Sequence, residues 1–147
     1  MSIAIRELGL ADRAMVEELL DRFTPGWSDA MAPTASGVTA FVADPHAFML
    51  GAYVDHDVAG WLWGTHFRRP NGEVTTYVDE LEVAEPHRRR GIATLLMQAA
   101  FESSRAAGAT ALFLVTRERN EIAQQLYREL DGDEETFRRY VWDLAPR

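Results

Sequence analysis

Cysteine and lysine are both absent from this chain of 147 residues, and each absence excludes a class of chemistry. Without cysteine there is no disulfide, no thiolate nucleophile and no Cys-ligated zinc site. Without lysine there is no Schiff-base nucleophile and no phosphate-loop lysine, since every basic residue is an arginine. The histidines do not have metal-ligand spacing either, so we expect no metal; they are His46, His56, His66 and His87.

Long apolar runs are also missing. None reaches the ~20 residues that a membrane span requires, and the first ten residues lack the basic and apolar regions of a signal peptide. We therefore expect a cytoplasmic protein with no membrane partner. Acidic residues outnumber arginines by 23 to 15, giving a formal charge of −8, which argues against nucleic-acid binding and favours a cationic partner. The length suits a single domain, residues 1–147.

The pattern of apolar residues predicts a mixed α/β domain in the order β-α-α-β-β-β-α-β-α-β. Helices are expected over residues 15–23, 38–42, 91–107 and 122–130, and strands over 3–8, 47–54, 58–67, 73–83, 111–115 and 137–144. The three runs within 47–83 form an antiparallel meander, with short connections at 55–57 and 70–72. The apolar run 111–115 is typical of a central buried strand. Residues 24–37 are expected to form a loop.

The segment Asp79–Ala93, DELEVAEPHRRRGIA, carries the chemistry. A strand ends, Pro86 follows it, and Gly91 opens a helix after three arginines. The first turn of a helix presents unpaired backbone N–H groups and a partial positive charge. Gly91 lets a ligand approach the backbone, and Arg88, Arg89 and Arg90 add positive charge beside these donors. This arrangement predicts a cradle for a pyrophosphate group.

Two sequence motifs, one after the other along the chain, resemble those of the GCN5-related N-acetyltransferase (GNAT) superfamily. Arg88-x-x-Gly91-x-Ala93 matches its acetyl-CoA loop, and Asn120-x-x-Ala123-x-x-Leu126-Tyr127-x-x-Leu130 matches its second motif. Within the superfamily, His87-Arg88-Arg89-x-Gly91-Ile92-Ala93-Thr94 is most similar to the aminoglycoside 3-N-acetyltransferases of the gentamicin-resistance type. The chain departs from the family pattern after Leu130, where acidic residues replace the usual Gly-Phe.

This resemblance implies a mostly antiparallel central sheet flanked by helices, acetyl-CoA as the acetyl donor, and a homodimer. It implies that the backbones of Leu81 and Val83 contact the pantetheine arm, and that Tyr127 protonates the departing sulfur. The remaining implied cofactor contacts are Arg88, Arg89, Arg90, Gly91, Ile92, Ala93, Thr94 and Asn120. Asp79 and Asp143 are the expected contacts to the acceptor substrate.

The general base is expected among the acids at the end of the third meander strand. Alternation along a strand places Glu80 and Glu82 on one face. Neighbouring carboxylates raise one another's pKa, which suits a base that works near neutrality. We favour Glu80, with Glu82 as the alternative and His66 in reserve. Trp61, Trp63 and Phe67 share one face of the neighbouring strand and are expected in the core, or less favourably as a substrate wall.

Three functions remain open on the sequence. The first is acetylation of a small cationic amine, such as an aminoglycoside, which would confer antibiotic resistance. The second is acetylation of another amine: a polyamine, an amino acid or a peptide N-terminus. The third is a non-catalytic domain that senses acetyl-CoA. The tyrosine and the acid pair favour an enzyme over a sensor, since a binding module requires neither.

Overall fold

The computed structural model describes residues 1–28 and 31–147, which form two compact units, 1–115 and 116–147. The first unit contains β1 (Ile3–Glu7), η1 (Leu10–Asp12), α1 (Arg13–Phe23), α2 (Ala35–Ala43), β2 (Ala47–Val54), β3 (Asp57–Arg68), β4 (Val74–Val83), η2 (Glu85–His87), α3 (Ile92–Ala106) and β5 (Ala109–Leu114). The second unit contains α4 (Glu121–Glu129). The predicted loop 24–37 lies partly outside the described residues, and its last three residues belong to α2.

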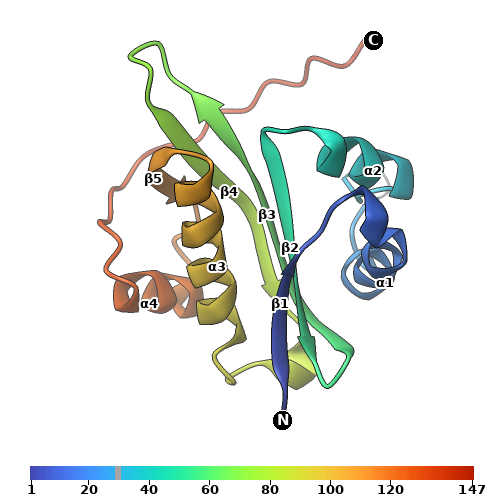
Figure 1. Cartoon of the computed structure of the whole chain (residues 1–147). Helices are drawn as coiled ribbons and strands as arrows, with labels where there is room; N and C mark the ends of the chain where they lie inside the picture. The colour runs from blue at the N-terminus through green and yellow to red at the C-terminus, as the bar shows by residue number, and fades with distance from the viewer. Residues whose placement is uncertain (29–30) are drawn as a thin grey trace. The chain divides into compact units, whose positions relative to one another are not determined.

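The first unit is a sheet with helices on both faces, which confirms the predicted mixed α/β class. The strand order is β1-β2-β3-β4-β5, and only the β4–β5 pair is parallel. Helices α1 and α2 cover one face and α3 the other (Figure 1). The turn between β2 and β3 has positive φ at Asp55 and His56, which is the geometry of a tight hairpin turn and confirms the predicted meander.

The core beneath α1 and α2 is built around aromatic side chains. Trp61 of β3 is fully buried, and the ring of Phe23 stacks on it at 5.1 Å between centroids. Trp63, two residues along the same face, packs edge-on against Phe41 of α2 at 5.7 Å. Phe67 is only half-buried and meets Phe113 of β5. The expectation of a core role therefore holds for the two tryptophans.

A β-bulge in β4 changes which face its residues present. Gly64 of β3 pairs with Val78, and the preceding Trp63 pairs with Glu80, so Asp79 is the extra residue of β4. Directly paired residues of an antiparallel ladder point to the same face. Glu80 therefore lies on the same face as Trp63, which helices α1 and α2 cover. Glu82, two residues further along β4, pairs with Trp61 and lies on this face as well.

Two predicted strands differ from expectation. The run 111–115 was expected to be central, but β5 (Ala109–Leu114) pairs only with β4 among the described strands, and Phe113 is 43% exposed. Residues 137–144 have no regular secondary structure. Their alternating pattern suits a strand, but a strand forms only where a partner edge satisfies its backbone groups, and no described strand pairs with this segment. Across the residues that the structure describes, no helix is both long and apolar enough to cross a membrane.

The close packing beside the bulge requires glycine at position 64, and Gly64→Ala tests this. A Cβ at this position would overlap the backbone oxygen of Tyr77 and approach the Phe48 ring to 3.1 Å. We expect the substitution to lower the free energy of unfolding by about 1–3 kcal/mol, the usual cost of overpacking. Urea denaturation measures this loss. Gly9→Ala is the matched control, because a Cβ there meets nothing closer than 4.0 Å; equal stability of the two variants would contradict the packing argument.

Candidate active site

Two partly buried carboxyl groups lie on the sheet face that α1 and α2 cover. Burial, reinforced by the neighbouring charges of Glu82 and Asp79, raises the pKa of Glu80 from 4.5 to about 7. The backbone N–H of Leu81 partly offsets this shift by hydrogen bonding to the carboxylate. Burial also raises the pKa of Glu82, against an opposing effect of Arg88. Glu80 can therefore gain or lose a proton near neutrality, as a general base must.

The carboxyl end of β4 separates from β5. The two strands pair only along Val74–Val78, whereas β4 continues beside β3 as far as Val83. Ala84 donates its N–H to Ala59 of β3 at 2.8 Å. Alternation of the antiparallel ladder consequently turns the backbone groups of Leu81 and Val83 away from β3, toward the side where β5 has ended. The backbone groups of Leu81 and Val83, which the sequence predicts as contacts to the pantetheine arm, are therefore not used in pairing with β3 or β5.

The segment after β4 leads into the N-terminus of α3. Gly91 is the N-cap residue and has φ +79°, in the left-handed region that favours glycine. A Cβ at this position would meet no protein atom within 4 Å, so the backbone is open to an approaching group. The next N–H groups, of Ile92, Ala93 and Thr94, belong to the first helical turn and have no intrahelical partner. These features fit the pyrophosphate of a nucleotide-containing cofactor.

The three arginines before Gly91 are all exposed. Arg88 donates from Nε to the carbonyl oxygen of Val83 at 2.9 Å, so its side chain is fixed against the end of β4. Arg89 has φ +62°, an uncommon conformation for a side chain with a Cβ. The backbone therefore turns sharply at position 89, two residues before the N-cap of α3.

His87 has a structural role that the sequence analysis did not predict. The residue is buried, and its Nε2 lies 2.8 Å from Oδ2 of Asp57, at the start of β3. This contact anchors the loop before Gly91 to the β2–β3 hairpin. The two residues are 30 positions apart, and no local pattern in the sequence connects them.

His66, the reserve base, faces the opposite side of the sheet from Glu80. Its Nδ1 lies 2.8 Å from the hydroxyl of Thr76, its ring stacks on Phe48 at 4.6 Å, and burial lowers its pKa. Its ladder partner Thr76 precedes the bulge, and the bulge separates these residues from the face of the glutamates. The structure therefore gives His66 a packing role.

The remaining predicted residues belong to the second unit. Asn120 is the N-cap of α4, and its side chain accepts a hydrogen bond from the N–H of Ala123 at 3.2 Å. Helix capping is sufficient to account for the three-residue spacing of Asn120 and Ala123, and the bond leaves the amide NH₂ of Asn120 available as a donor. Tyr127 lies in α4 and is half-buried. Asp143 is exposed and accepts from the N–H of Ala145.

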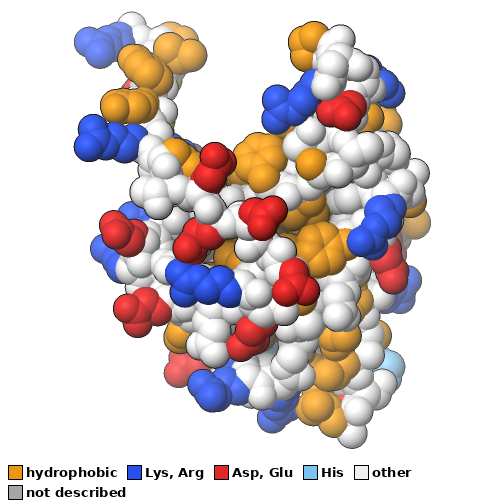
Figure 2. All heavy atoms as spheres, turned by 90° about the vertical axis from the view of Figure 1, so that its left-hand side faces the viewer, with side chains coloured by type: hydrophobic (Ala, Val, Ile, Leu, Met, Phe, Trp, Pro, Cys, Tyr) orange, Lys and Arg blue, Asp and Glu red, His pale blue; other side chains and the backbone are white. Residues whose placement is uncertain are grey.

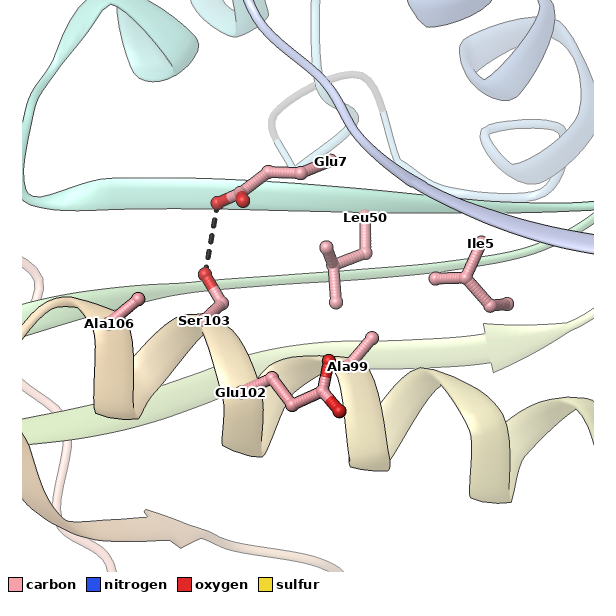
Figure 3. Close-up of a pocket in the computed structure, with 7 residues that line it drawn as sticks. All are labelled: Ile5, Glu7, Leu50, Ala99, Glu102, Ser103 and Ala106. Atoms are coloured by element: carbon pink, nitrogen blue, oxygen red, sulfur yellow. Dashed lines mark hydrogen bonds between the residues drawn. The ribbon is translucent and has the colours of Figure 1, made fainter.

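A separate hollow lies between α3 and strands β1 and β2 (Figure 3). Its volume is about 410 Å³, and Ser103 donates to Glu7 across it at 2.9 Å. Its lining residues are Ile5, Glu7, Leu50, Ala99, Glu102, Ser103 and Ala106. None of the predicted site residues is among them, so this hollow is distinct from the end of β4. Among the described residues, no group of three or more His, Asp or Glu side chains could hold a metal ion.

Comparisons with known proteins agree with this arrangement. Residues 13–131 match the model of the Acetyltransferase (GNAT) family. An aminoglycoside N(6′)-acetyltransferase type 1 from Acinetobacter haemolyticus is 33% identical over 94 residues, which span 61% of this chain and 65% of that protein. The fold is similar to that of an aminoglycoside acetyltransferase, HMB0005, from an uncultured soil metagenomic sample (TM-score 0.87, 25% identity, covering 99% and 100% of the two chains).

A further similar fold is that of AAC(6′)-Iy, solved with the bisubstrate analogue CoA-S-monomethyl-acetylneamine (TM-score 0.78, 18% identity, covering 99% and 100%). The family match extends from α1 to the end of α4 and so includes β4, the Gly91 turn and α3. The strand end that separates from its neighbour, the open glycine turn and the family match lead to one conclusion: this chain belongs to the GNAT acetyltransferase family.

Proposed function

We propose that this chain is an acetyl-CoA-dependent N-acetyltransferase that acetylates a primary amine of a small cationic acceptor, an aminoglycoside. The observation that carries the proposal is the carboxyl group of Glu80. It is partly buried with a pKa of about 7, and it lies on the strand whose end leads into the Gly91 turn. A domain that only binds acetyl-CoA has no use for such a group. The family match and the names of the similar proteins support the same reading.

The end of β4 and the start of α3 would hold the donor. The N–H groups of Ile92, Ala93 and Thr94 would bind the pyrophosphate beside Gly91, with Arg88, Arg89 and Arg90 adding positive charge. The backbones of Leu81 and Val83 and the amide of Asn120 would hold the pantetheine arm. Acetyl-CoA supplies an activated acetyl thioester when bound, and the N–H of Val83 would polarise its carbonyl.

Proton transfer in the proposed reaction is shared between two residues. An amine attacks only in its neutral form, so Glu80 would accept the proton of the acceptor ammonium, directly or through water, with Glu82 as the second candidate. The hydroxyl of Tyr127 would give a proton to the sulfur as the C–S bond breaks and the C–N bond forms. Asp79 and Asp143 would attract the positive charge of the acceptor. Direct transfer is required because the chain has no cysteine to carry the acetyl group.

Two positions on an aminoglycoside are candidates for acetylation. The sequence likeness indicates the 3-N amine, and the name of the Acinetobacter relative specifies the N(6′) amine. The two products differ in which ring carries the acetyl group, so an NMR spectrum of the isolated product identifies the reactive amine.

Acetyl-CoA should raise the melting temperature of the protein, because a ligand that binds only the folded state stabilises it. We then expect release of free CoA thiol with aminoglycosides in a panel that also contains polyamines, amino acids and peptides. Thiol release with another amine class alone would contradict the aminoglycoside acceptor. Stabilisation without thiol release from any amine would indicate a sensor, and no stabilisation would refute the cofactor assignment.

Tyr127→Phe should lower kcat, by about 10²- to 10⁴-fold if the hydroxyl is the general acid. The affinity for acetyl-CoA, measured by calorimetry, should change little, because the ring is retained. Tyr140→Phe is the matched control, since Tyr140 also lies in the second unit and is 69% exposed. An unchanged kcat for the Tyr127 variant would exclude its role as the acid.

Glu80→Gln tests the base by pH dependence. In the wild type, kcat/KM should rise with pH through about 7 as Glu80 ionises, and the variant should lose most of the activity and this rise. The pKa of Glu80 is higher in the folded than in the unfolded chain, so the wild type should lose stability as pH rises from 4.5 to about 7. The variant should show a smaller loss in urea titrations across that range, because the pKa of Glu82 is also raised and still contributes a loss of the same sign. Exposed Glu102→Gln is the control and should retain both profiles.

A further inference from the structure

The loop that joins β4 to α3, residues 84–90, has an uncommon backbone conformation. Arg89 has φ +62° and Gly91 has φ +79°, so the chain turns sharply twice within three residues. A residue with a Cβ keeps a positive φ only where its surroundings fix it. The loop, the β2–β3 turn and the N-terminus lie at one end of the sheet (Figure 1), and basic side chains lie on the surface at this lower end (Figure 2).

The middle of the loop has one hydrogen bond to a strand other than β4, among the residues that the structure describes. Ala84, at the start of the loop, donates its N–H to Ala59 of β3 at 2.8 Å. At the other end, Nη1 of Arg90 lies 3.4 Å from the sulfur of Met1, which is a weak acceptor on an exposed residue. Between these two contacts, His87 alone connects the loop to β3.

The side chain of His87 is held by a carboxylate. Its Nε2 lies 2.8 Å from Oδ2 of Asp57. Because a carboxylate can only accept a hydrogen bond, Nε2 carries the proton in this contact. The other ring nitrogen, Nδ1, is buried and has no hydrogen-bond partner among the described residues. A phenylalanine ring would fill similar space without an unpaired nitrogen, so packing alone does not explain an imidazole here. The bond to Asp57 does explain it.

Asp57 belongs to a well-supported part of the sheet. It pairs with Val54 across the β2–β3 turn, whose residues Asp55 and His56 have positive φ. Oδ1 of Asp55 accepts from the N–H of Ser2 at 2.8 Å, and Asp55 donates its own N–H to the carbonyl oxygen of Ser2 at 2.9 Å. The turn is thus connected to the start of the chain as well as to β2 and β3. A loop residue bonded to Asp57 is consequently held by the sheet itself.

Ordering this loop without an anchor would be costly. The three successive arginines, Arg88–Arg90, carry like charges that repel one another, and Arg89 adopts a conformation that few residues with a Cβ adopt. A binding site that becomes ordered only when its ligand arrives loses affinity to that cost. A side-chain bond that holds the loop beforehand removes part of the cost.

We propose that Asp57 and His87 act together as positioning residues for the donor. Their bond holds the loop in the free protein so that the first N–H groups of α3 are directed at the pyrophosphate of acetyl-CoA. This inference rests on the proposed function, but it gives neither residue a part in acetyl transfer. The pair therefore sets the affinity for acetyl-CoA through preorganisation and leaves the chemical step unchanged.

Backbone order in the ligand-free protein provides the first test. Asp57 is exposed, so Asp57→Ala removes the carboxylate with little loss of packing. In ¹⁵N relaxation measurements, the order parameters at residues 88–91 should fall from about 0.85 to below about 0.6. Asp57→Asn should retain most of the order, because its amide oxygen can still accept from Nε2. Asp21→Ala, which removes an exposed carboxylate of α1, is the control and should change nothing in the loop. Unchanged order in Asp57→Ala would overturn the proposal.

The affinity for coenzyme A, measured by calorimetry, provides the second test. Coenzyme A carries the pyrophosphate but has no acetyl group to transfer. Asp57→Ala and His87→Phe should each weaken its binding about 10-fold, as expected for the loss of one hydrogen bond to a charged group. The double variant should bind no more weakly than either single variant, because both remove the same bond. The kcat at saturating acetyl-CoA should be retained, since only binding is altered.

The outcomes separate this inference from the proposed function. If the wild type binds no coenzyme A, the proposed function fails. If the wild type binds it and Asp57→Ala binds it equally well, the proposed function stands and the positioning role is refuted. Additive losses in the double variant, or a kcat that falls while the affinity is retained, would also refute the positioning role.

Discussion

The extra residue at Asp79 determines which side of the sheet the end of β4 presents. Before the bulge, Thr76 and Val78 are buried beside β3, with Thr76 bonded to His66. After it, Glu80 and Glu82 share the face of Trp61 and Trp63. Without the extra residue, alternation would turn the carboxyl groups to the opposite face and away from α1 and α2. The partial burial that raises the pKa of Glu80 follows from this one insertion.

The same strand connects two sites of opposite charge preference. The partly buried acids precede Val83, and the arginines and the first turn of α3 follow it. Residues 86–119 contain six arginines and two acidic residues, whereas the rest of the chain is strongly acidic. This division of charge along the chain suits the anionic donor and the cationic acceptor proposed above. The contact of His87 with Asp57 and the bond from Arg88 to Val83 hold the connecting loop in place.

Local patterns were sufficient for most elements. Alternation predicted the meander 47–83, and the turn at Asp55-His56 has the positive φ values that short hairpins require. Gly91 precedes α3 and Gly108 follows it, as the sequence predicted, and both have the positive φ that glycine adopts readily at helix termini. The prediction of a strand at 137–144 was wrong. An alternating pattern shows that a segment could pair in a sheet, but it does not show that a partner edge is available. The same reason applies to the run 111–115, whose apolar residues do not reveal that only one edge is paired.

The sequence by itself determined the residue types and their order: a strand, an arginine loop, a glycine turn and an amphipathic helix, with acids just before them. These depend on spacing along the chain, which local rules read directly. The tertiary structure alone decided that Asp79 forms a bulge, that Glu80 is buried enough to titrate near neutrality, and that His87 is held by Asp57. Each of these depends on which backbone lies opposite, and contacts between residues distant in the chain leave no local pattern.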